Sequence, residues 1–293
     1  MENILKQLSA QSVALVDTAK HAVVCVGAGQ VLPRSGLAIG NGEVVTLARQ
    51  ADAGEHVPVV VDGEARDSTV VGYDGASGVA LLKVEGMDQS ARLADRLPVV
   101  GEIGVTIAYP VPEGHEARLS MVRCVGGQTR LPGGRRIGAY LQTDDARFRG
   151  FAASVLFSAE GDALGITIPS RGRGESFLMP VGELISIVDQ IRSGESFGTG
   201  YLGVQTTAVD LPEPTEGYTR GLLIVGVEAD SPAERAGLNV GGFVVAVGGR
   251  ATPDLEQLYD ALTGLKSGES IDVTVASSEG ATKIVPVKVE LRA

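Results

Sequence analysis

Short runs of alternating apolar and polar residues fill the chain from about Ala22 to Pro169. They recur roughly every 10–15 residues, and turn pairs such as Asn41-Gly42 and Asp62-Gly63 separate them. Closely spaced strands without helices between them predict barrels or a sandwich. The polar stretch 85–97 divides this region into two halves.

The composition agrees with a chain of strands and tight turns. Of the 293 residues, 40 are glycine and 44% are hydrophobic, which excludes a disordered chain. The glycines follow no three-residue period, so a collagen-like chain is excluded as well. The length exceeds one ordinary core of about 100–150 residues and predicts two or three modules.

The apolar period changes near Val181, where a helical spacing predicts a helix over 182–193. After it, the Gly/Ser-rich stretch 193–200 is typical of a linker. The last ninety residues contain the capping box Ser231-Pro232-Ala233-Glu234 and a second helix that begins near Pro253. We therefore expect an N-terminal helical segment (1–21), a strand-rich domain (22–192), a linker (193–200) and a C-terminal domain (201–293).

Charge and residue types exclude several function classes. The net charge of −11 argues against a nucleic-acid-binding face, and no run reaches the roughly 18 apolar residues of a membrane span. Cys25 and Cys124 lie far apart in alternating runs, so we expect buried free thiols rather than a disulfide. No ligand spacing indicates a metal site, and we expect no cofactor.

The N-terminal residues lack the continuous apolar segment of a signal peptide, which indicates a cytoplasmic protein by default. Their apolar side chains instead fit a short amphipathic helix that packs on the body of the protein. The side chains of this predicted helix face are Ile4, Leu5, Leu8, Val13, Leu15 and Val16.

Several segments resemble parts of one protease family. Tyr201-Leu202-Gly203-Val204 is similar to the carboxylate-binding loop of a PDZ domain, and 231–238 and 241–250 are similar to its first helix and following strand. Upstream, 35–46, 70–84 and 141–167 resemble the segments that lead into or carry the catalytic residues of the HtrA/Deg family, and 177–181 resembles the last barrel strand of that family. The resemblance implies a mostly β fold, a chymotrypsin-like double six-stranded β-barrel followed by an α+β PDZ domain.

The three catalytic positions that this resemblance assigns hold unsuitable residues. Arg49 stands at the histidine position, Gly78 at the aspartate position and Ala152 at the serine position. Arginine stays protonated and cannot act as a general base, and glycine and alanine offer neither a carboxylate nor a hydroxyl. We therefore expect no enzyme activity. Ala153 and Ser154 replace glycines after the nucleophile, so we also expect a disturbed backbone there.

Displaced catalytic residues are an alternative. Ser154 lies two positions beyond the expected nucleophile, and His21, His56 and His115 are the only histidines. We favour surface or loop positions for the histidines over a relocated serine–histidine pair. The adjacent Asp144 and Asp145 could serve as acid and base, but Asp144 matches a common structural residue of the family.

The PDZ resemblance implies binding of peptide C-termini. Amides of the Tyr201–Val204 loop would hold the terminal carboxylate, and the peptide would add as a strand beside that segment. The residues expected to bind the peptide are Tyr201, Leu202, Gly203, Val204, Leu255, Leu258, Tyr259 and Leu262. A PDZ fold that only packs against the barrels is the alternative.

Three predicted loops contain several arginines, although the chain as a whole is acidic. One hypothesis is that Arg135, Arg136, Arg147 and Arg149, together with Arg49, Arg130, Arg171 and Arg173, bind an acidic partner or another anion around the catalytic position, but we favour the alternative that follows. Ordinary solvated loop arginines are the alternative.

The leading interpretation is an inactive HtrA-like protein that binds protein C-termini as an adaptor, a chaperone-like holder or a regulatory subunit. A structural assembly protein and an active endopeptidase with displaced residues are the alternatives. A second copy or an active paralogue is an expected partner. The family's trimers use N-terminal aromatic residues, and residues 1–25 contain none, so a trimer is doubtful. Family members mostly act outside the cytoplasm.

Overall fold

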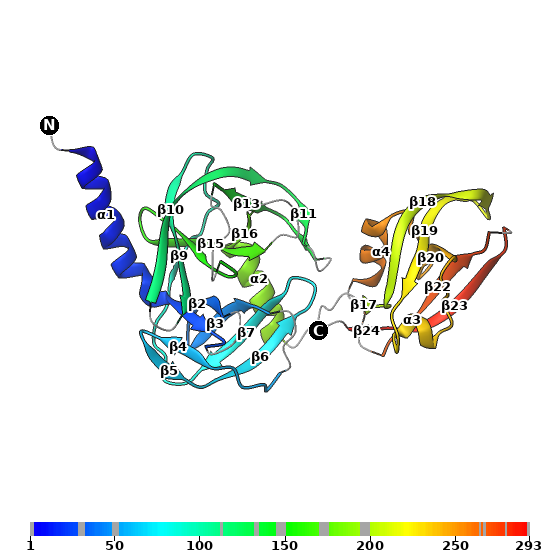
Figure 1. The fold of residues 1–293 in the computed structure, drawn as a ribbon, viewed down its shortest axis with the longest axis horizontal. Coiled ribbons are helices and arrows are strands. Elements are labelled where there is room, and N and C mark those ends of the chain that lie inside the picture. Colours follow the sequence, from blue (N-terminus) through cyan, green and yellow to red (C-terminus); the bar gives the residue numbers. More distant parts are fainter. Residues whose placement is uncertain are drawn as a thin grey trace. The chain divides into compact units, whose positions relative to one another are not determined.

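The computed structural model describes residues 3–291, apart from 29–32, 49–52, 112–113, 132–134, 145–150, 170–175, 194–199, 264, 266–267 and 279. The chain divides into two compact units (Figure 1). The first contains most residues up to Glu195, and the second is built mainly from Ser196–Ala293.

The first sheet of the first unit has the strand order β5-β4-β1-β2-β3-β7-β6, and every neighbouring pair is antiparallel. Apolar residues of its strands point to both sides, and Val24, Val44 and Leu82 fill the interior of this first barrel. The strands are β1 (Val23–Val26), β2 (Arg34–Gly40), β3 (Glu43–Leu47), β4 (Val59–Val61), β5 (Glu64–Arg66), β6 (Ser68–Asp74) and β7 (Val79–Val84).

The second sheet closes into a six-stranded barrel. Its order is β14-β9-β10-β13-β16-β15-β8, and an additional β14–β15 pairing joins the two ends of the six-strand ring, while β8 lies parallel to β15. The strands are β8 (Arg92–Leu93), β9 (Ile103–Val111), β10 (Gly114–Gly126), β13 (Tyr140–Thr143), β14 (Val155–Ser158), β15 (Asp162–Pro169) and β16 (Ser176–Pro180), and β11 (Thr129–Arg130) and β12 (Arg136–Ile137) form a separate hairpin.

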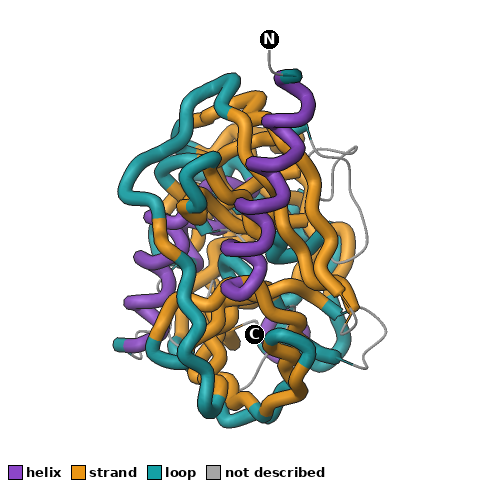
Figure 2. The backbone as a smooth tube through the Cα atoms, turned by 90° about the vertical axis from the view of Figure 1, so that its left-hand side faces the viewer, coloured by secondary structure: helices purple, strands orange, loops and turns teal. Residues whose placement is uncertain are grey.

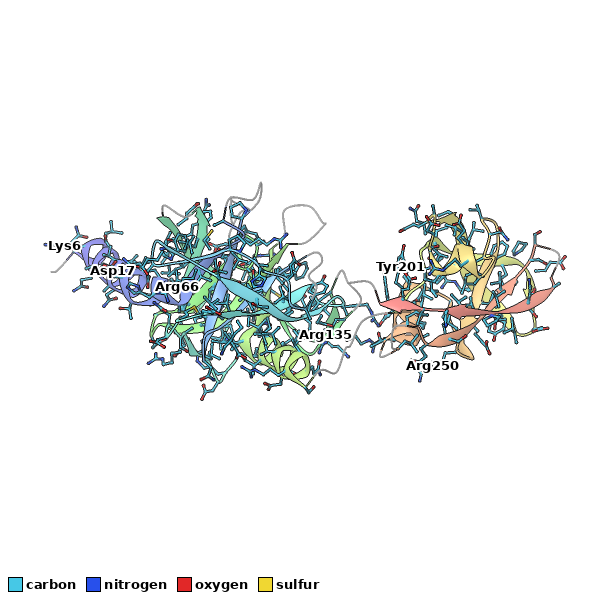
Figure 3. The ribbon with its side chains drawn as sticks, turned by 90° about the horizontal axis from the view of Figure 1, so that it is seen from below. Lys6, Asp17, Arg66, Arg135, Tyr201 and Arg250 are labelled. Carbon is cyan, nitrogen blue, oxygen red and sulfur yellow. The ribbon has the colours of Figure 1, made fainter. Side chains whose placement is uncertain are left out.

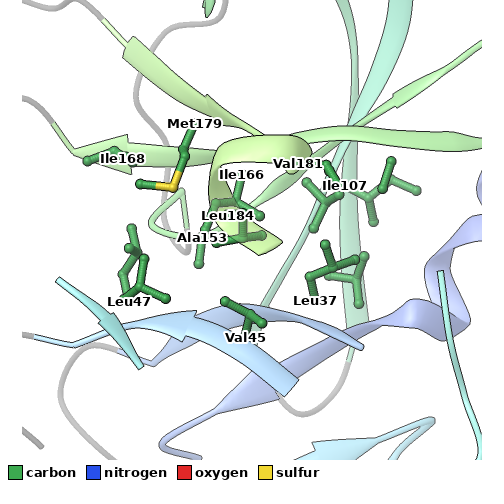
Figure 4. Packing of buried hydrophobic residues seen from close by; sticks show 14 of the residues in the cluster. Leu37, Val45, Leu47, Ile107, Ala153, Ile166, Ile168, Met179, Val181 and Leu184 are labelled. Atoms are coloured by element: carbon green, nitrogen blue, oxygen red, sulfur yellow. The ribbon is translucent and has the colours of Figure 1, made fainter. Parts of the chain in front are cut away.

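One large apolar core joins the two barrels (Figure 4). Leu37 and Val45 enter it from the first barrel, and Ile107 and Met179 enter it from the second. The predicted helix forms as α2 (Val181–Arg192) and buries Leu184 and its apolar neighbours against the same core. The alternating pattern of the sequence therefore produces the expected mostly β double-barrel fold.

Helix α1 (Ile4–Ala19) is longer than the expected short helix and only partly packed. Leu15, Val16 and Ala19 contact the shared core, where the one-turn helix η1 (Lys20–Ala22) leads into β1. The other apolar residues of α1 are exposed, with accessible fractions of 77% for Ile4, 74% for Leu5, 38% for Leu8 and 59% for Val13. The expectation that all of them pack on the body is therefore wrong for Ile4, Leu5, Leu8 and Val13. Figure 2 shows the course of α1 from the N-terminal end of the chain.

The second unit has a five-strand sheet in the order β18-β19-β20-β22-β23, with β21 paired to β20 and a separate β17–β24 pair. The Ser231 hydroxyl caps helix α3 (Pro232–Arg235) by accepting from the Glu234 amide at 3.2 Å, as the capping box predicts. The remaining elements are β17 (Gly200–Tyr201), β18 (Val204–Thr215), β19 (Tyr218–Val227), β20 (Phe243–Val247), β21 (Arg250–Ala251), α4 (Leu255–Leu262), β22 (Ser270–Ala276), β23 (Thr282–Lys288) and β24 (Glu290–Leu291).

Both cysteines are free thiols, with Cys25 buried and Cys124 half-buried. Among the described residues, no helix has the length and apolar character needed to cross a membrane. Within the same ranges, no three side chains of His, Cys, Asp or Glu gather as the ligands of a metal ion would.

His115 lies near the start of β10 and is partly buried, whereas we expected a surface or loop position for it. Its ring stacks on Tyr109 with a centroid distance of 3.9 Å, and its Nε2 lies 2.9 Å from the Val23 carbonyl oxygen. Burial lowers the pKa of this imidazole below its ordinary value of 6.5. The neutral ring, with Nε2–H as donor to Val23, therefore links the second barrel to β1.

The pKa of His115 predicts acid sensitivity. In the unfolded chain His115 takes up a proton near pH 6.5, whereas the folded state resists protonation, so the free energy of unfolding falls as the pH drops below about 6.5. We expect His115→Gln to flatten this slope in urea unfolding measured between pH 7.5 and 5. His56→Gln, which removes an exposed histidine, is the control. An unchanged slope in His115→Gln would contradict the assignment.

Candidate functional site

The Tyr201–Val204 loop joins β17 to β18 in the second unit, where Figure 3 labels Tyr201. Gly203 has a φ of +81°, which side-chain-bearing residues rarely adopt. A Cβ added at Gly203 would lie 2.2 Å from the Ser231 Cβ. Only glycine therefore allows the loop to run this close to the cap of α3.

Two carbonyl groups anchor the loop on one side. The Leu202 carbonyl accepts from the Ala233 amide at 2.7 Å, and the Gly203 carbonyl accepts from the Glu228 amide at 2.8 Å. The Tyr201 hydroxyl also donates to the Glu228 carboxylate. Within the described residues, the amides of Leu202 and Gly203 donate to no backbone carbonyl. The loop therefore keeps two backbone donors available for an anion.

Strand β18 follows this loop and lies at one edge of the sheet, because β19 is its single neighbour in the described part of the sheet. Helix α4 lies beside β18, and its N-cap is Asp254, whose carboxylate accepts from the Glu256 amide at 2.8 Å. A Cβ on Gly200 would lie 3.3 Å from the Leu262 carbonyl oxygen, so the C-terminal end of α4 adjoins the loop. An edge strand flanked by a helix is the arrangement that accepts an added peptide strand.

The predicted peptide-binding residues fall into two groups. Leu202, Leu258 and Leu262 belong to the apolar core of this unit and are nearly inaccessible. Val204 and Tyr259 are half-buried and Leu255 is exposed. The sequence pattern identified the face of α4 that turns toward the core. The structure adds that Leu258 and Leu262 are buried, whereas Leu255 and Tyr259 are accessible.

In the first unit, Gly78 lies in the turn between β6 and β7 with a φ of +78°. Its amide donates to the Asp74 carbonyl at 2.7 Å, and its carbonyl accepts from the Ala48 amide at 2.9 Å. The expected histidine and aspartate segments are therefore adjacent, although Arg49 itself lies outside the described residues. The Tyr73 hydroxyl donates to the Ala48 carbonyl at 3.3 Å, and burial, followed by the nearby Asp74, raises the pKa of this phenol.

Ala152 lies next to the start of β2, because its carbonyl accepts from the Ser35 amide at 3.2 Å. Ala153 is fully buried and has a φ of +60°, and its amide donates to the Thr167 carbonyl at 2.9 Å. The glycine-like conformation that we expected to be lost is therefore present at Ala153. Gly150, Arg147 and Arg149 lie outside the described residues.

The displaced serine–histidine pair gains no support. Ser154 is fully buried, and its hydroxyl lies 2.8 Å from the Thr167 hydroxyl. His21 instead contacts the Asp62 carboxylate at 2.6 Å, and His115 contacts Val23. Asp144 accepts from the Met121 amide at 2.8 Å, which is the structural role that we favoured for it.

Only some of the arginines in the predicted anion site lie among the described residues. The Arg135 amide donates to the Ala76 carbonyl at 3.2 Å, which brings this loop next to the turn that contains Gly78. Arg130 and Arg136 are cross-strand neighbours in the β11–β12 hairpin. Arg171 and Arg173 join Arg147 and Arg149 outside the described residues, so the anion site stays a prediction.

Similarity to known proteins agrees with this architecture. Residues 200–289 match the PDZ domain family. A probable periplasmic DegP-like serine endoprotease of Ectopseudomonas mendocina is 30% identical over 271 residues, covering 88% of this chain and 55% of that protein. Serine protease HTRA1 of Xenopus tropicalis is 25% identical over 274 residues, covering 85% and 56%. The chain thus spans about half the length of these relatives.

Solved structures share the whole fold. The serine endoprotease from Yersinia pestis has a TM-score of 0.64 at 21% identity, covering 96% of this chain and 97% of that one. The HtrA-type protease AlgW with a tripeptide has a TM-score of 0.60 at 21% identity, with the same coverage.

The Tyr201–Val204 loop yields a stability prediction with a matched control. We expect Gly203→Ala to lower the free energy of unfolding of the second unit by about 2–4 kcal/mol, because it adds a clash to an unfavourable φ. Gly217 has a similarly positive φ of +89° but open space around an added Cβ, so Gly217→Ala should cost about 1–2 kcal/mol. Urea unfolding measures both, and equal losses would contradict the close approach to Ser231.

The double barrel, the sheet of the second unit and these relatives agree with one another, and the chain is an HtrA-type protein with a trypsin-like domain followed by a PDZ domain.

Proposed function

We propose that this protein is a catalytically inactive HtrA-type protein that binds the C-termini of other proteins through its PDZ domain. It acts as an adaptor, a chaperone-like holder or a regulatory subunit. The observation that carries the proposal is the pair of available amides at Leu202 and Gly203, beside the open edge of β18. A terminal carboxylate accepts hydrogen bonds from such amides, and the preceding residues pair with the strand edge.

Inactivity rests on the residue types at the three catalytic positions. Gly78 and Ala152 supply no side-chain acid, base or nucleophile, and Arg49 cannot accept a proton at neutral pH. Proteolysis by the family's mechanism requires all three roles, and losing any of them lowers the rate by orders of magnitude. The buried Ser154 hydroxyl, which contacts Thr167, offers no substitute nucleophile.

One of the similar solved structures is that of the HtrA-type protease AlgW with a tripeptide. We extend peptide binding to this chain because its own loop and strand edge have the required donors. The interface is small, so dissociation constants on the order of 1–100 μM are expected.

Peptide binding is tested with the full chain and a peptide that ends in an apolar residue with a free carboxylate. The amidated form of the same peptide should bind at least about tenfold more weakly, because it loses the charge-assisted hydrogen bonds to the loop. Leu255→Glu should weaken binding by a similar factor, because it places a carboxylate on the accessible face of α4. Ile284→Glu, on the opposite edge strand β23, is the control and should bind normally. Equal affinity for the acid and the amide in calorimetry would refute the proposal.

Inactivity is tested by turnover of fluorescently labelled casein and by labelling with a fluorophosphonate probe, alongside an active HtrA-type protease as positive control. We expect casein turnover at the level of buffer alone and no labelling. Turnover or labelling that disappears in Ser154→Ala would show an active enzyme with a displaced nucleophile and would refute the inactive assignment.

A further inference from the structure

The two outer strands of the second unit differ in how they are protected. In the described part of its sheet, β18 lies at one edge and β23 at the other (Figure 1). Edge strands carry unpaired main-chain groups, and proteins usually protect such edges with charges or prolines. Strand β23 carries Lys283, Pro286 and Lys288. The stretch 204–209 of β18 contains no charged residue and no proline, so this edge stays open to another strand.

The hydrogen bonds to β19 show which residues of β18 face outward. The Glu228 amide donates to the Gly203 carbonyl at 2.8 Å, and Val204 is the cross-strand partner of Val227. Val204 and Val227 therefore form a non-hydrogen-bonded pair, and the amide and carbonyl of Val204 point away from β19. This orientation alternates along a strand. The residues of β18 that share it with Val204 are Thr206, Ala208 and Asp210.

The open edge ends after Asp210. Leu211 is buried in an apolar cluster separate from the core beside α4, and the register with β19 shifts between Asp210 and Thr215. The next two positions in the outward alternation are Pro212 and Pro214, which have no amide hydrogen. Outward-facing main-chain donors for a further strand are therefore provided up to Asp210.

Helix α4 flanks the part of this edge that is nearest to the preceding loop. Its C-terminal end adjoins Gly200, because a Cβ there would lie 3.3 Å from the last carbonyl oxygen of the helix. Its eight residues extend about 12 Å, whereas the strand residues 204–210 extend about 23 Å. Thr206 is half-buried, whereas Ala208 and Asp210 are exposed. Side chains of α4 can therefore contact a bound strand over about the first half of the edge.

We propose that this edge holds about the last seven residues of an extended C-terminal tail. The edge begins at the loop with two available amides, so a strand that ends in a free carboxylate matches both features. In an antiparallel pairing every second residue of the tail forms hydrogen bonds with an outward-facing residue of β18. Counted back from the end, the last, third, fifth and seventh residues pair with Val204, Thr206, Ala208 and Asp210.

The two halves of the edge have different selectivity. Side chains of the last three residues of the tail lie beside α4, which selects among them. The upstream residues are held by main-chain hydrogen bonds, which any sequence except proline can make. The substrate class is therefore proteins that end in an unstructured tail of at least about seven residues. This inference rests on the proposed function, because it assumes that the loop amides bind the carboxylate.

Peptide length provides the first test. Acetylated peptides of three, five, seven and nine residues, with the same last three residues, are titrated into the full chain by calorimetry. Each step up to seven residues should strengthen binding about threefold to tenfold, as one added net hydrogen bond or two would. Seven and nine residues should bind equally. Two seven-residue peptides that differ upstream of their last three residues should agree within about twofold.

Methylation of single peptide amides locates the hydrogen bonds. In the seven-residue peptide, the amide of the fifth residue from the end donates to the Ala208 carbonyl, so methylating it should weaken binding at least about threefold. The amide of the fourth residue from the end points away from β18. Methylating that amide is the matched control and should leave the affinity unchanged.

Ala208→Pro is the corresponding change in the protein. It removes an outward-facing donor from an exposed position of an edge strand, where proline is tolerated. It should weaken the seven-residue peptide at least about threefold and leave the three-residue peptide unchanged. Ile284→Pro is the control, because it lies two residues before Pro286 on the opposite edge strand and shares its orientation. It should leave both affinities unchanged.

The outcomes separate this inference from the proposed function. If no peptide of any length binds, both are refuted. If three residues bind as tightly as seven, or if the two methylated peptides bind equally, the long edge contact is refuted and capture of the last residues is retained. A further gain of more than about threefold from seven to nine residues, or a strong dependence on the upstream sequence, would also overturn this inference. If circular dichroism shows Ala208→Pro to be unfolded, the methylated peptides decide with the unchanged protein.

Discussion

The apolar core shared by the two barrels is the constraint on which the rest of the first unit depends. Leu37 and Val45 from one barrel meet Ile107 and Met179 from the other, and Leu184 of α2 seals their contact. Full burial of each such side chain contributes about 1.5–3 kcal/mol, so this contact decides whether the barrels stay together. Gly78 and Ala152 contribute almost no side chain to it. The packing of the two barrels therefore does not depend on the side chains at positions 78 and 152.

The backbone of this frame is held by hydrogen bonds rather than by catalytic side chains. The Gly78 carbonyl accepts from the Ala48 amide, and the Ala152 carbonyl accepts from the Ser35 amide. The Ser35 carbonyl in turn accepts from the Thr46 hydroxyl, so the three segments that hold the expected catalytic positions are adjacent. Ala153 keeps a left-handed conformation that costs an alanine about 1–2 kcal/mol. The hydrogen bond from the Ala153 amide to the Thr167 carbonyl and the contact between the Ser154 and Thr167 hydroxyls hold that conformation. This explains why our expectation of a rearranged backbone was wrong at Ala153.

Local sequence patterns predicted the elements whose structure is determined by residues close together in the sequence. Strands buried on alternate faces give a period of two, and the cap of α3 is encoded by Ser231 and Glu234 within four residues. The extent of α1 packing was not predictable, because the helical period identifies an apolar face but not how much of it finds a partner. In the same way, the spacing of α4 did not distinguish the buried Leu258 and Leu262 from the accessible Leu255. That distinction depends on where β18 and the Gly200 segment lie, which is a tertiary property.

The proposed peptide capture would depend on directional hydrogen bonds from a few amides and on the open edge of β18. It would therefore need no side chain from the three positions that the family uses for catalysis. An interface this small binds weakly by itself. A target that offers two C-termini to two such loops would make its second contact at a high effective concentration, which would raise the affinity without a new contact in the groove itself.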